Sequence, residues 1–335
     1  MKEIKLLGIK LCNTCNLNCE MCAQRKQTEK QYEIDPQNLS DAVDQLLQWK
    51  KRFEVYLWGG EPFLHPQFFQ IVETMVQRHL PVIVNTNGTM LYRYADEICR
   101  SRIKRIIVSI DGTREIHNQI RGAEVYDDIV AGLRKVKLLR RFLPFITANV
   151  VVTQKNHTIL PQIVGSLFSI GAEFVEIQLP FFYTLAEGLD YEEWYSSQLE
   201  GRALSWMGFC ADYTNIETDK LSADIQRLEH IYGEKVHFVP NIAHQDIPAY
   251  FKSELRAGAQ DICSACTSQV RIEADGSVVL CPDYPDIVLG NIKDESILDI
   301  LQKEPYRSIR EKLAASPQHS LCHKCLFRFE QKTRN

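Results

Sequence analysis

The sequence predicts an α/β fold, in which a partial (β/α)6 barrel is followed by a small, cysteine-rich α+β domain. Two observations predict this arrangement. Residues 1–184 alternate short, β-branched runs with amphipathic stretches whose apolar residues recur every three or four positions. Residues 261–335 instead hold five of the eleven cysteines, spaced around a hairpin signal.

Six strand candidates alternate with helix candidates through the first part of the chain. The strands are expected at 4–11, 55–58, 82–85, 106–110, 146–152 and 174–179. The helices are expected at 39–51, 67–79, 92–99, 126–140 and 160–169. A helix in each gap implies a parallel sheet with right-handed crossovers. Six units are too few for a closed eight-stranded barrel, so we expect an open, TIM-like one.

Chemistry in such folds lies at the carboxyl ends of the strands, and polar or glycine-rich motifs follow the expected strands here. WGGEP follows the second strand, NTNGT the third, SIDG the fourth and TQKN the fifth. Residues 185–260 are polar and aromatic, and we interpret them as a linker or lid over the barrel mouth. The chain then divides into a barrel (1–184), this lid (185–260) and the cysteine-rich domain (261–335).

Bulk composition excludes several functional classes. The formal net charge is -4, which gives no general attraction for nucleic acid or for an anionic membrane. The N-terminal apolar run is too broken for a signal peptide, and no stretch approaches the length of a membrane helix. We therefore expect a cytoplasmic protein. Eleven cysteines in a reducing compartment favour metal binding or catalysis over disulfides.

The first cysteine cluster comes directly after the first expected strand. Cys15, Cys19 and Cys22 follow the spacing Cys-x3-Cys-x2-Cys. Three thiolates on a short loop suit a [4Fe–4S] cluster whose fourth iron stays open to a second molecule. The alternative is a zinc site, which would need a fourth ligand such as Cys12.

With Met21 in the apolar slot before the last cysteine, this loop resembles the signature of the radical S-adenosylmethionine (radical SAM) superfamily. The resemblance covers the chain from about residue 4 to residue 325. It implies that the open iron binds S-adenosylmethionine, and that reductive cleavage yields a 5′-deoxyadenosyl radical which abstracts a hydrogen atom from substrate. It also implies an electron donor such as a flavodoxin or ferredoxin.

Further cofactor contacts are expected at the other strand ends. Glycine lacks a Cβ, so Gly59 and Gly60 permit close backbone approach to a ligand. The segment Gly59-Gly60-Glu61-Pro62 is identical to the GGEP motif that binds the methionine amino group in the resembling family. Ser109 and Asp111 share a strand face and could hydrogen-bond the ribose or the carboxylate, although Asp111-Gly112 could instead form a turn or helix cap. The remaining candidates are Asn85, Thr86, Asn87 and Arg121, and a surface ion pair is the alternative for Arg121.

The C-terminal cysteines predict a second site. Asp275-Gly276 is a hairpin signal between Cys263 and Cys281, and Cys322-x2-Cys325 closes the region. Four thiolates suit zinc and iron–sulfur equally. The region resembles the SPASM and twitch extensions of radical SAM enzymes, in their shorter form. That resemblance implies one auxiliary [4Fe–4S] cluster held by Cys263, Cys281, Cys322 and Cys325, with Cys266 as the alternate to Cys263.

Our leading interpretation of function is hydrogen abstraction from a small, sugar-like substrate, leading to oxidation or epimerisation with help from the auxiliary cluster. Cys210 in the lid is the candidate hydrogen donor for an epimerisation, and a buried structural cysteine is its alternative. The second interpretation is modification of a ribosomal peptide, which the immediate start of the barrel disfavours. The third is a non-catalytic zinc or electron-transfer protein.

Overall fold

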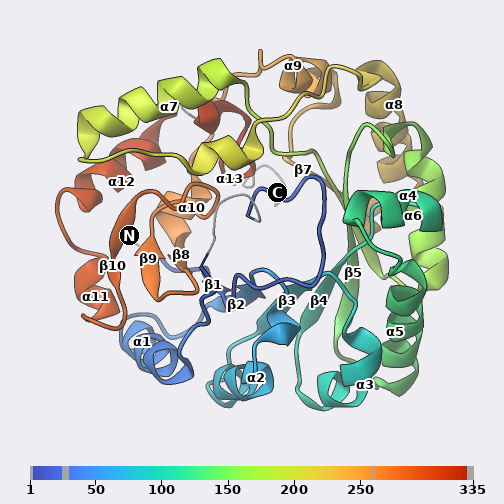
Figure 1. Cartoon of the computed structure of the whole chain (residues 1–335), viewed down its shortest axis with the longest axis horizontal. Helices are drawn as coiled ribbons and strands as arrows, with labels where there is room; N and C mark the ends of the chain where they lie inside the picture. Colours follow the sequence, from blue (N-terminus) through green and yellow to red (C-terminus); the bar gives the residue numbers. More distant parts are fainter. Residues whose placement is uncertain (1–2, 25–29, 259, 330–335) are drawn as a thin grey trace.

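A curved, ten-stranded sheet forms the centre of the molecule. The computed structural model describes residues 3–24, 30–258 and 260–329. Within them the strand order is β10-β9-β8-β1-β2-β3-β4-β5-β6-β7. Neighbours from β8 to β7 pair in parallel, and β9 and β10 pair antiparallel. Figure 1 shows the strands on the inside of a ring whose outside is covered by helices.

The six expected strands are all present near their expected positions. They are β1 (Leu6–Lys10), β2 (Glu54–Trp58), β3 (Val82–Thr86), β4 (Arg105–Ser109), β5 (Phe145–Val151) and β6 (Phe174–Gln178). Each pairs in parallel with the next, which confirms the open α/β barrel. Because all six run the same way, their carboxyl ends lie at one edge of the sheet, where the polar motifs follow.

The helices between these strands cover the outer face of the barrel. They are α1 (Pro36–Trp49), α2 (Phe68–Gln77), α3 (Leu91–Arg100), α4 (Arg114–Arg121), α5 (Tyr126–Leu139) and α6 (Leu160–Ile170). Helix α1 begins where the Asp35 side chain accepts from the Asn38 backbone N–H, with Pro36 at its first position. Helix α4 was not anticipated from the sequence. No helix in the described part of the chain is long and apolar enough to cross a membrane.

Residues 185–260 add a further helix–strand unit to the barrel as well as covering segments. After α7 (Leu185–Gln198) and the short 3₁₀ helix η4 (Ser205–Phe209), helix α8 (Thr218–Tyr232) leads into β7 (Val236–Val239). Strand β7 pairs in parallel with β6 and forms one end of the sheet. Helix α9 (Ile247–Phe251) follows it. The sequence interpretation as a lid missed this strand, which is only four residues long.

The cysteine-rich region is joined to the barrel by the same sheet. The expected hairpin is present as β8 (Gln269–Ile272) and β9 (Ser277–Val279), and β10 (Val288–Asn291) completes it. Strand β8 pairs in parallel with β1, so the sheet continues directly from this region into the barrel. The helices here are α10 (Ser264–Ser268), α11 (Ile297–Ile300), α12 (Tyr306–Ala315), α13 (Leu326–Phe329) and the 3₁₀ helix η7 (Ser320–Lys324).

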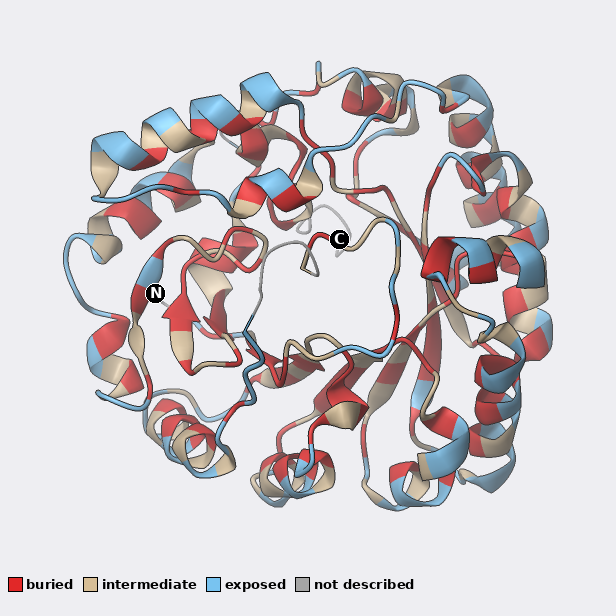
Figure 2. Cartoon of the chain, viewed as in Figure 1, coloured by how far each residue is buried: buried red, intermediate tan, exposed pale blue. Residues whose placement is uncertain are grey.

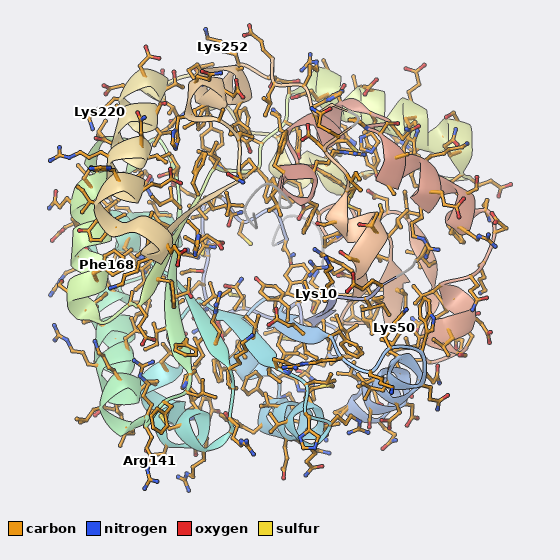
Figure 3. The ribbon with its side chains drawn as sticks, turned by 180° about the vertical axis from the view of Figure 1, so that it is seen from behind. Lys10, Lys50, Arg141, Phe168, Lys220 and Lys252 are labelled. Carbon is orange, nitrogen blue, oxygen red and sulfur yellow. The ribbon has the colours of Figure 1, made fainter. Side chains whose placement is uncertain are left out.

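Alternation along the strands separates an apolar outer layer from a polar interior. On β2, Val55 and Leu57 are fully buried beneath the helices, whereas Tyr56 and Trp58 are half-buried on the other face. Figure 2 shows the buried residues concentrated on the strands and on the sides of the helices that face them. Figure 3 places Lys10 within the ring of strands, far from the peripheral lysines. Lys10 is 6 % exposed, and its Nζ lies 3.0 Å from Glu273 Oε2.

Candidate active site

The first three cysteines lie together on the loop that leaves the carboxyl end of β1. Cys15 is exposed, and Cys19 and Cys22 are half-buried. Asn87 Nδ2 donates to Cys15 Sγ at 3.8 Å, and Arg121 Nη1 donates to Cys19 Sγ at 3.7 Å. Burial raises the pKa of the Cys19 thiol, and the positive charge of Arg121 opposes that rise. Cationic and amide donors aimed at sulfur stabilise thiolates, which is the form that ligates metal.

The two glycines of the GGEP segment pack against this cysteine loop. Gly60 N donates to Cys12 O at 2.8 Å, and Glu61 N donates to Thr14 O at 2.9 Å. A Cβ on Gly60 would lie 2.1 Å from Thr14 O, and one on Gly59 would lie 2.3 Å from Cys12 O. The close approach that the sequence predicted is therefore made to the chain's own backbone at the start of the cysteine loop. Cys12 itself is fully buried, and its thiol donates to Glu61 O at 3.3 Å.

Glu61 links the ends of β2 and β3 from a fully buried position. Its carboxylate accepts from Thr86 Oγ1 at 2.8 Å, from Asn87 N at 2.8 Å and from Phe63 N at 3.2 Å. Burial raises the pKa of Glu61 to about 7, and these hydrogen bonds oppose the rise. Because Asn87 then donates to Cys15, the buried carboxylate acts on the cysteine loop through the Asn87 turn. Pro62, also buried, begins the short 3₁₀ turn that Glu61 caps.

Asp111 and Arg121 form a second buried support for the loop. Asp111 Oδ2 lies 2.6 Å from Arg121 Nε, and Asp111 Oδ1 accepts from Val151 N at 2.9 Å. Asp111 is fully buried and Arg121 is 9 % exposed, so this is an interior ion pair and not the surface pair weighed from the sequence. Its carboxylate oxygens both accept from the chain, and the ion pair holds Arg121 against Cys19. The unexpected helix α4 carries Arg121 at its last position.

Two other candidates line the barrel interior below this layer. Ser109 is half-buried at the end of β4 and pairs in register with Asn149 of β5. Asn85 is half-buried on β3 and hydrogen-bonds the Tyr56 hydroxyl. They share the interior with the Asn149–Gln178 pair, whose side-chain amides lie 3.1 Å apart. The structure brings both residues to the polar bore without direct contact to the cysteine loop in the described hydrogen bonds.

All five C-terminal cysteines lie close enough to influence one another's titration. Cys263 hydrogen-bonds Cys266, and both feel the charge of Cys322. Burial raises the pKa of Cys281 and of Cys325, and nearby thiolates add to the rise. At Cys322 burial is outweighed by contact with His319 and by the charge of Arg328, which together lower its pKa to about 6. The structure keeps both Cys263 and Cys266 beside the other three thiols, so the choice between them stays a prediction.

A cavity of about 310 Å³ lies beside the first cysteine loop. Glu20 and Met21 of that loop form one wall, and the Glu20 carboxylate pairs with Lys155 Nζ at 2.6 Å. The opposite wall comes from the segment around η4. The lining residues are Glu20, Met21, Thr153, Gln154, Lys155, Phe181, Gly208, Phe209, Ala211, Asp212 and Tyr213. The cavity therefore connects the cysteine loop, the carboxyl end of β5 and the lid.

Comparison with known families fits both cysteine groups. The radical SAM superfamily model matches residues 9–159, and the model of the SPASM iron–sulfur cluster-binding domain matches residues 263–326. The chain belongs to the radical SAM superfamily. Membership of the two families makes S-adenosylmethionine and [4Fe–4S] clusters the cofactors of this radical SAM protein.

Curated relatives resemble parts of this radical SAM chain. It is 25% identical over 179 residues to the tungsten-containing aldehyde ferredoxin oxidoreductase cofactor-modifying protein of Pyrococcus furiosus, a match that covers 51% of the chain and 50% of the relative. It is 28% identical over 144 residues to the mycofactocin maturase MftC of Mycobacterium tuberculosis, covering 42% and 36%. The matched part thus spans about half or less of the length of these relatives.

Solved radical SAM structures match nearly the whole chain in fold. The structure titled anSMEcpe with bound AdoMet has a TM-score of 0.65 at 18% identity, covering 97% of this chain and 84% of that one. Streptococcus suis SuiB bound to its precursor peptide SuiA has a TM-score of 0.68 at 12% identity, covering 97% and 71%. At these identities the likeness establishes the fold.

The donor sets of this radical SAM chain fit the two clusters. Cys15, Cys19 and Cys22 are three thiols on one accessible loop, with N–H donors already aimed at two of the sulfurs. The C-terminal thiols are mostly enclosed and number at least four, as a fully ligated cluster needs. Among the described residues, no three His, Cys, Asp or Glu side chains form a group that could hold a single metal ion.

Cys210 lies at the edge of the cavity and not in the protein core. Its thiol is exposed, and it directly follows η4, between the lining residues Phe209 and Ala211. Its backbone forms a bridge with Tyr183. The buried structural cysteine weighed from the sequence is therefore wrong for this residue, while its role as a hydrogen donor stays a prediction.

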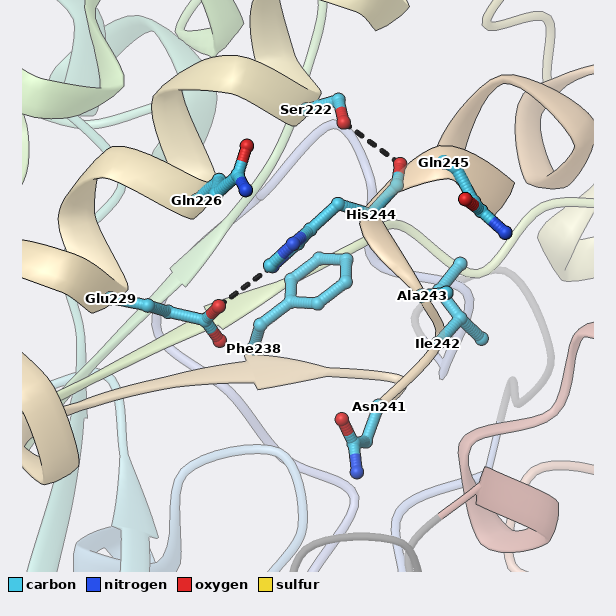
Figure 4. Close-up of a pocket in the computed structure, with 9 residues that line it drawn as sticks. All are labelled: Ser222, Gln226, Glu229, Phe238, Asn241, Ile242, Ala243, His244 and Gln245. Atoms are coloured by element: carbon cyan, nitrogen blue, oxygen red, sulfur yellow. Dashed lines mark hydrogen bonds and ion pairs between the residues drawn. The ribbon is translucent and has the colours of Figure 1, made fainter.

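A second cavity of about 560 Å³ lies apart from the cysteines, between α8 and the segment that follows β7. Figure 4 shows His244 in it, directed toward Glu229 and lying over the Phe238 ring. His244 Nε2 and Glu229 Oε2 are 2.7 Å apart, and Ser222 Oγ donates to His244 O at 2.8 Å. No motif in the sequence indicated this cavity, because its lining is assembled from polar residues of two separate segments.

Proposed function

We propose that this chain is a radical SAM enzyme that modifies a peptide. The observation that carries the proposal is the accessible three-cysteine loop beside a cavity whose opposite wall comes from the lid. In this proposal Cys15, Cys19 and Cys22 hold the cluster that binds S-adenosylmethionine. Reductive cleavage of that cofactor supplies a 5′-deoxyadenosyl radical, which takes a hydrogen atom from the substrate.

The residues around the loop would position and shield this chemistry. Asn87 and Arg121 donate to two of the sulfurs, which stabilises negative charge on them. Glu61 and Asp111 hold those two donors from buried positions and need not touch the substrate. The Glu20–Lys155 pair lies across the cavity and joins the cysteine loop to the end of β5.

The names of similar proteins favour a peptide over the sugar-like substrate that we placed first from the sequence. MftC is a maturase, SuiB was solved with its precursor peptide, and anSMEcpe was solved with the Cp18Cys peptide. The starting point of the barrel, which seemed to disfavour a peptide, carries no weight against these parallels. Oxidation or epimerisation of a small molecule becomes the second candidate.

The surface beside the cavity also supports a peptide. Leu185 and Leu189 of α7 are exposed, as are Leu204 and Met207 at η4. These two elements are packed together, because a Cβ on Gly188 of α7 would lie 2.0 Å from the Trp206 ring. Apolar side chains on such a surface can contact the side chains of an extended substrate that reaches past the cavity.

The test measures 5′-deoxyadenosine formed by anaerobically reconstituted protein with S-adenosylmethionine and a reductant. One arm adds a peptide library, the other adds monosaccharides and nucleotide sugars, and Cys22→Ala is the inactive control. Stimulation by peptides alone is the expected result. Stimulation by sugars alone would overturn the peptide assignment, and no 5′-deoxyadenosine in either arm would overturn the enzyme assignment. A flavodoxin or ferredoxin in place of the chemical reductant tests the proposed electron donor.

A further inference from the structure

A buried lysine lies between the last two cysteines. The Lys324 side chain is 1% exposed, and its Nζ lies 3.2 Å from Glu187 Oε1 and 2.8 Å from Ser253 Oγ. The same Nζ lies 4.0 Å from the ring centroid of Phe182 and 5.1 Å from that of Tyr183. An ammonium group is costly to bury unless it is paired and hydrogen-bonded, and this surrounding satisfies both needs.

The partner carboxylate belongs to the first turn of α7. Glu187 forms a capping box with Thr184, accepting from Thr184 N at 2.8 Å while Thr184 Oγ1 accepts from Glu187 N at 3.2 Å. One turn further along α7, Asp190 accepts from Ser320 N at 2.6 Å. Helix α7 therefore holds the Cys322–Cys325 loop at two points, and the buried one involves Lys324.

The segment that leads into α7 is also a wall of the cavity beside the first cysteine loop. Phe181 and Phe209 both line that cavity. Tyr183 N donates to Phe209 O at 3.1 Å, which holds the two parts of the wall together. A short run of contacts thus connects the auxiliary cysteines, Lys324, the start of α7 and the cavity.

We propose that the Glu187–Lys324 pair is a positioning pair for the auxiliary cluster, fixing the Cys322–Cys325 loop on α7 and setting the cluster's reduction potential through the balance of the two charges. The proposal rests on the assignment of the C-terminal cysteines to that cluster. As a neutral pair, the two residues leave the potential nearly unshifted, so removing either charge shifts it in a direction set by the charge that remains.

The experiment uses full-length protein carrying Cys15→Ala, Cys19→Ala and Cys22→Ala, in which only the auxiliary cluster contributes signal. Lys324→Met is expected to lower the midpoint potential, because it leaves the Glu187 charge. Glu187→Gln is expected to raise it, because it leaves the ammonium. The double variant should return toward the starting value, and Lys324→Arg should preserve it. Redox titration and the EPR spectrum are measured together with iron content and melting temperature.

Lys303→Met is the matched control, since Lys303 pairs with Glu295 on the surface of the same region. It should leave potential and spectrum unchanged. Equal potentials in all iron-loaded variants, or shifts of the same sign from both single variants, would overturn the proposal. If Lys324→Met loses its iron, Glu187→Gln and the double variant decide the matter by the same criterion. A background protein without any four-iron cluster would overturn the cysteine assignment itself.

Discussion

Glu61 and Asp111 show how much of this site depends on carboxylates that stay away from its surface. The sequence singled out both as ligand contacts, yet each is fully buried and bonded to the chain. Their partners, such as Asn87 and Val151, are distant in sequence and become neighbours only through the sheet. Sequence motifs therefore identified the right residues, but the division between contact and support needed the fold.

Replacing Glu61 with Gln should flatten the pH dependence of stability. The pKa of Glu61 is raised from 4.5 to about 7 by burial, so the folded state binds the extra proton between these values. Its contribution to stability is fully present below about pH 4.5 and is lost as the pH rises through about 7. Melting temperatures measured across this window should fall with pH in the wild type and less steeply in Glu61→Gln. Parallel profiles would contradict the burial of an ionisable group here.

Asp111→Asn should be strongly destabilising, because it leaves the buried Arg121 guanidinium without its counter-charge. Breaking one side of a buried pair costs about 3–5 kcal/mol. Asp127→Asn is the matched control, since the Asp127–Arg114 pair joins the same residue types with side chains 62% and 58% exposed. It should cost no more than about 1 kcal/mol. Urea unfolding of both variants measures the difference, and similar losses would mean that the Asp111 pair is well solvated.

At the scale of elements, the barrel strands were predictable and several connecting pieces were not. The strands announce themselves through β-branched runs bounded by turn residues, and all six lie close to their expected positions. Helix α4 has no such signal, because its buried residues include His117, Asn118 and Arg121 beside Ile120. Strands β7 and β8 are four residues each, and only their pairing with β6 and β1 defines them.

The contact between the GGEP segment and the cysteine loop gives a prediction about two elements together. Gly60→Ala should displace the loop, because its Cβ would lie 2.1 Å from Thr14 O, an immovable backbone atom. We expect loss of iron from the first site while the auxiliary iron is retained. Gly165→Ala in α6 is the control, since its Cβ would meet nothing closer than 3.9 Å and alanine favours a helix by about 1 kcal/mol. Full iron content in Gly60→Ala would show that the loop adapts.

Across the whole molecule, the two groups of cysteines have very different structural settings. The first three lie on a loop above the sheet, and one of them is exposed. The C-terminal thiols instead join α10, β9, η7 and α13, which are attached to the barrel through the β8–β1 pairing. The spacing of the cysteines indicated two sites, but it held no information on this asymmetry, which arises from strands more than 250 residues apart.

The asymmetry predicts different consequences when each site is removed. Changing Cys15, Cys19 and Cys22 to Ala should lower the iron content from about eight to about four per chain, with a small change in melting temperature. Changing Cys263, Cys281, Cys322 and Cys325 to Ala should remove the other four and lower the melting temperature clearly, because those thiols hold separate elements together. Iron analysis and calorimetry on anaerobic protein measure both quantities. Equal melting temperatures in the two variants would mean that the sheet and its core hold the C-terminal region without the auxiliary cluster.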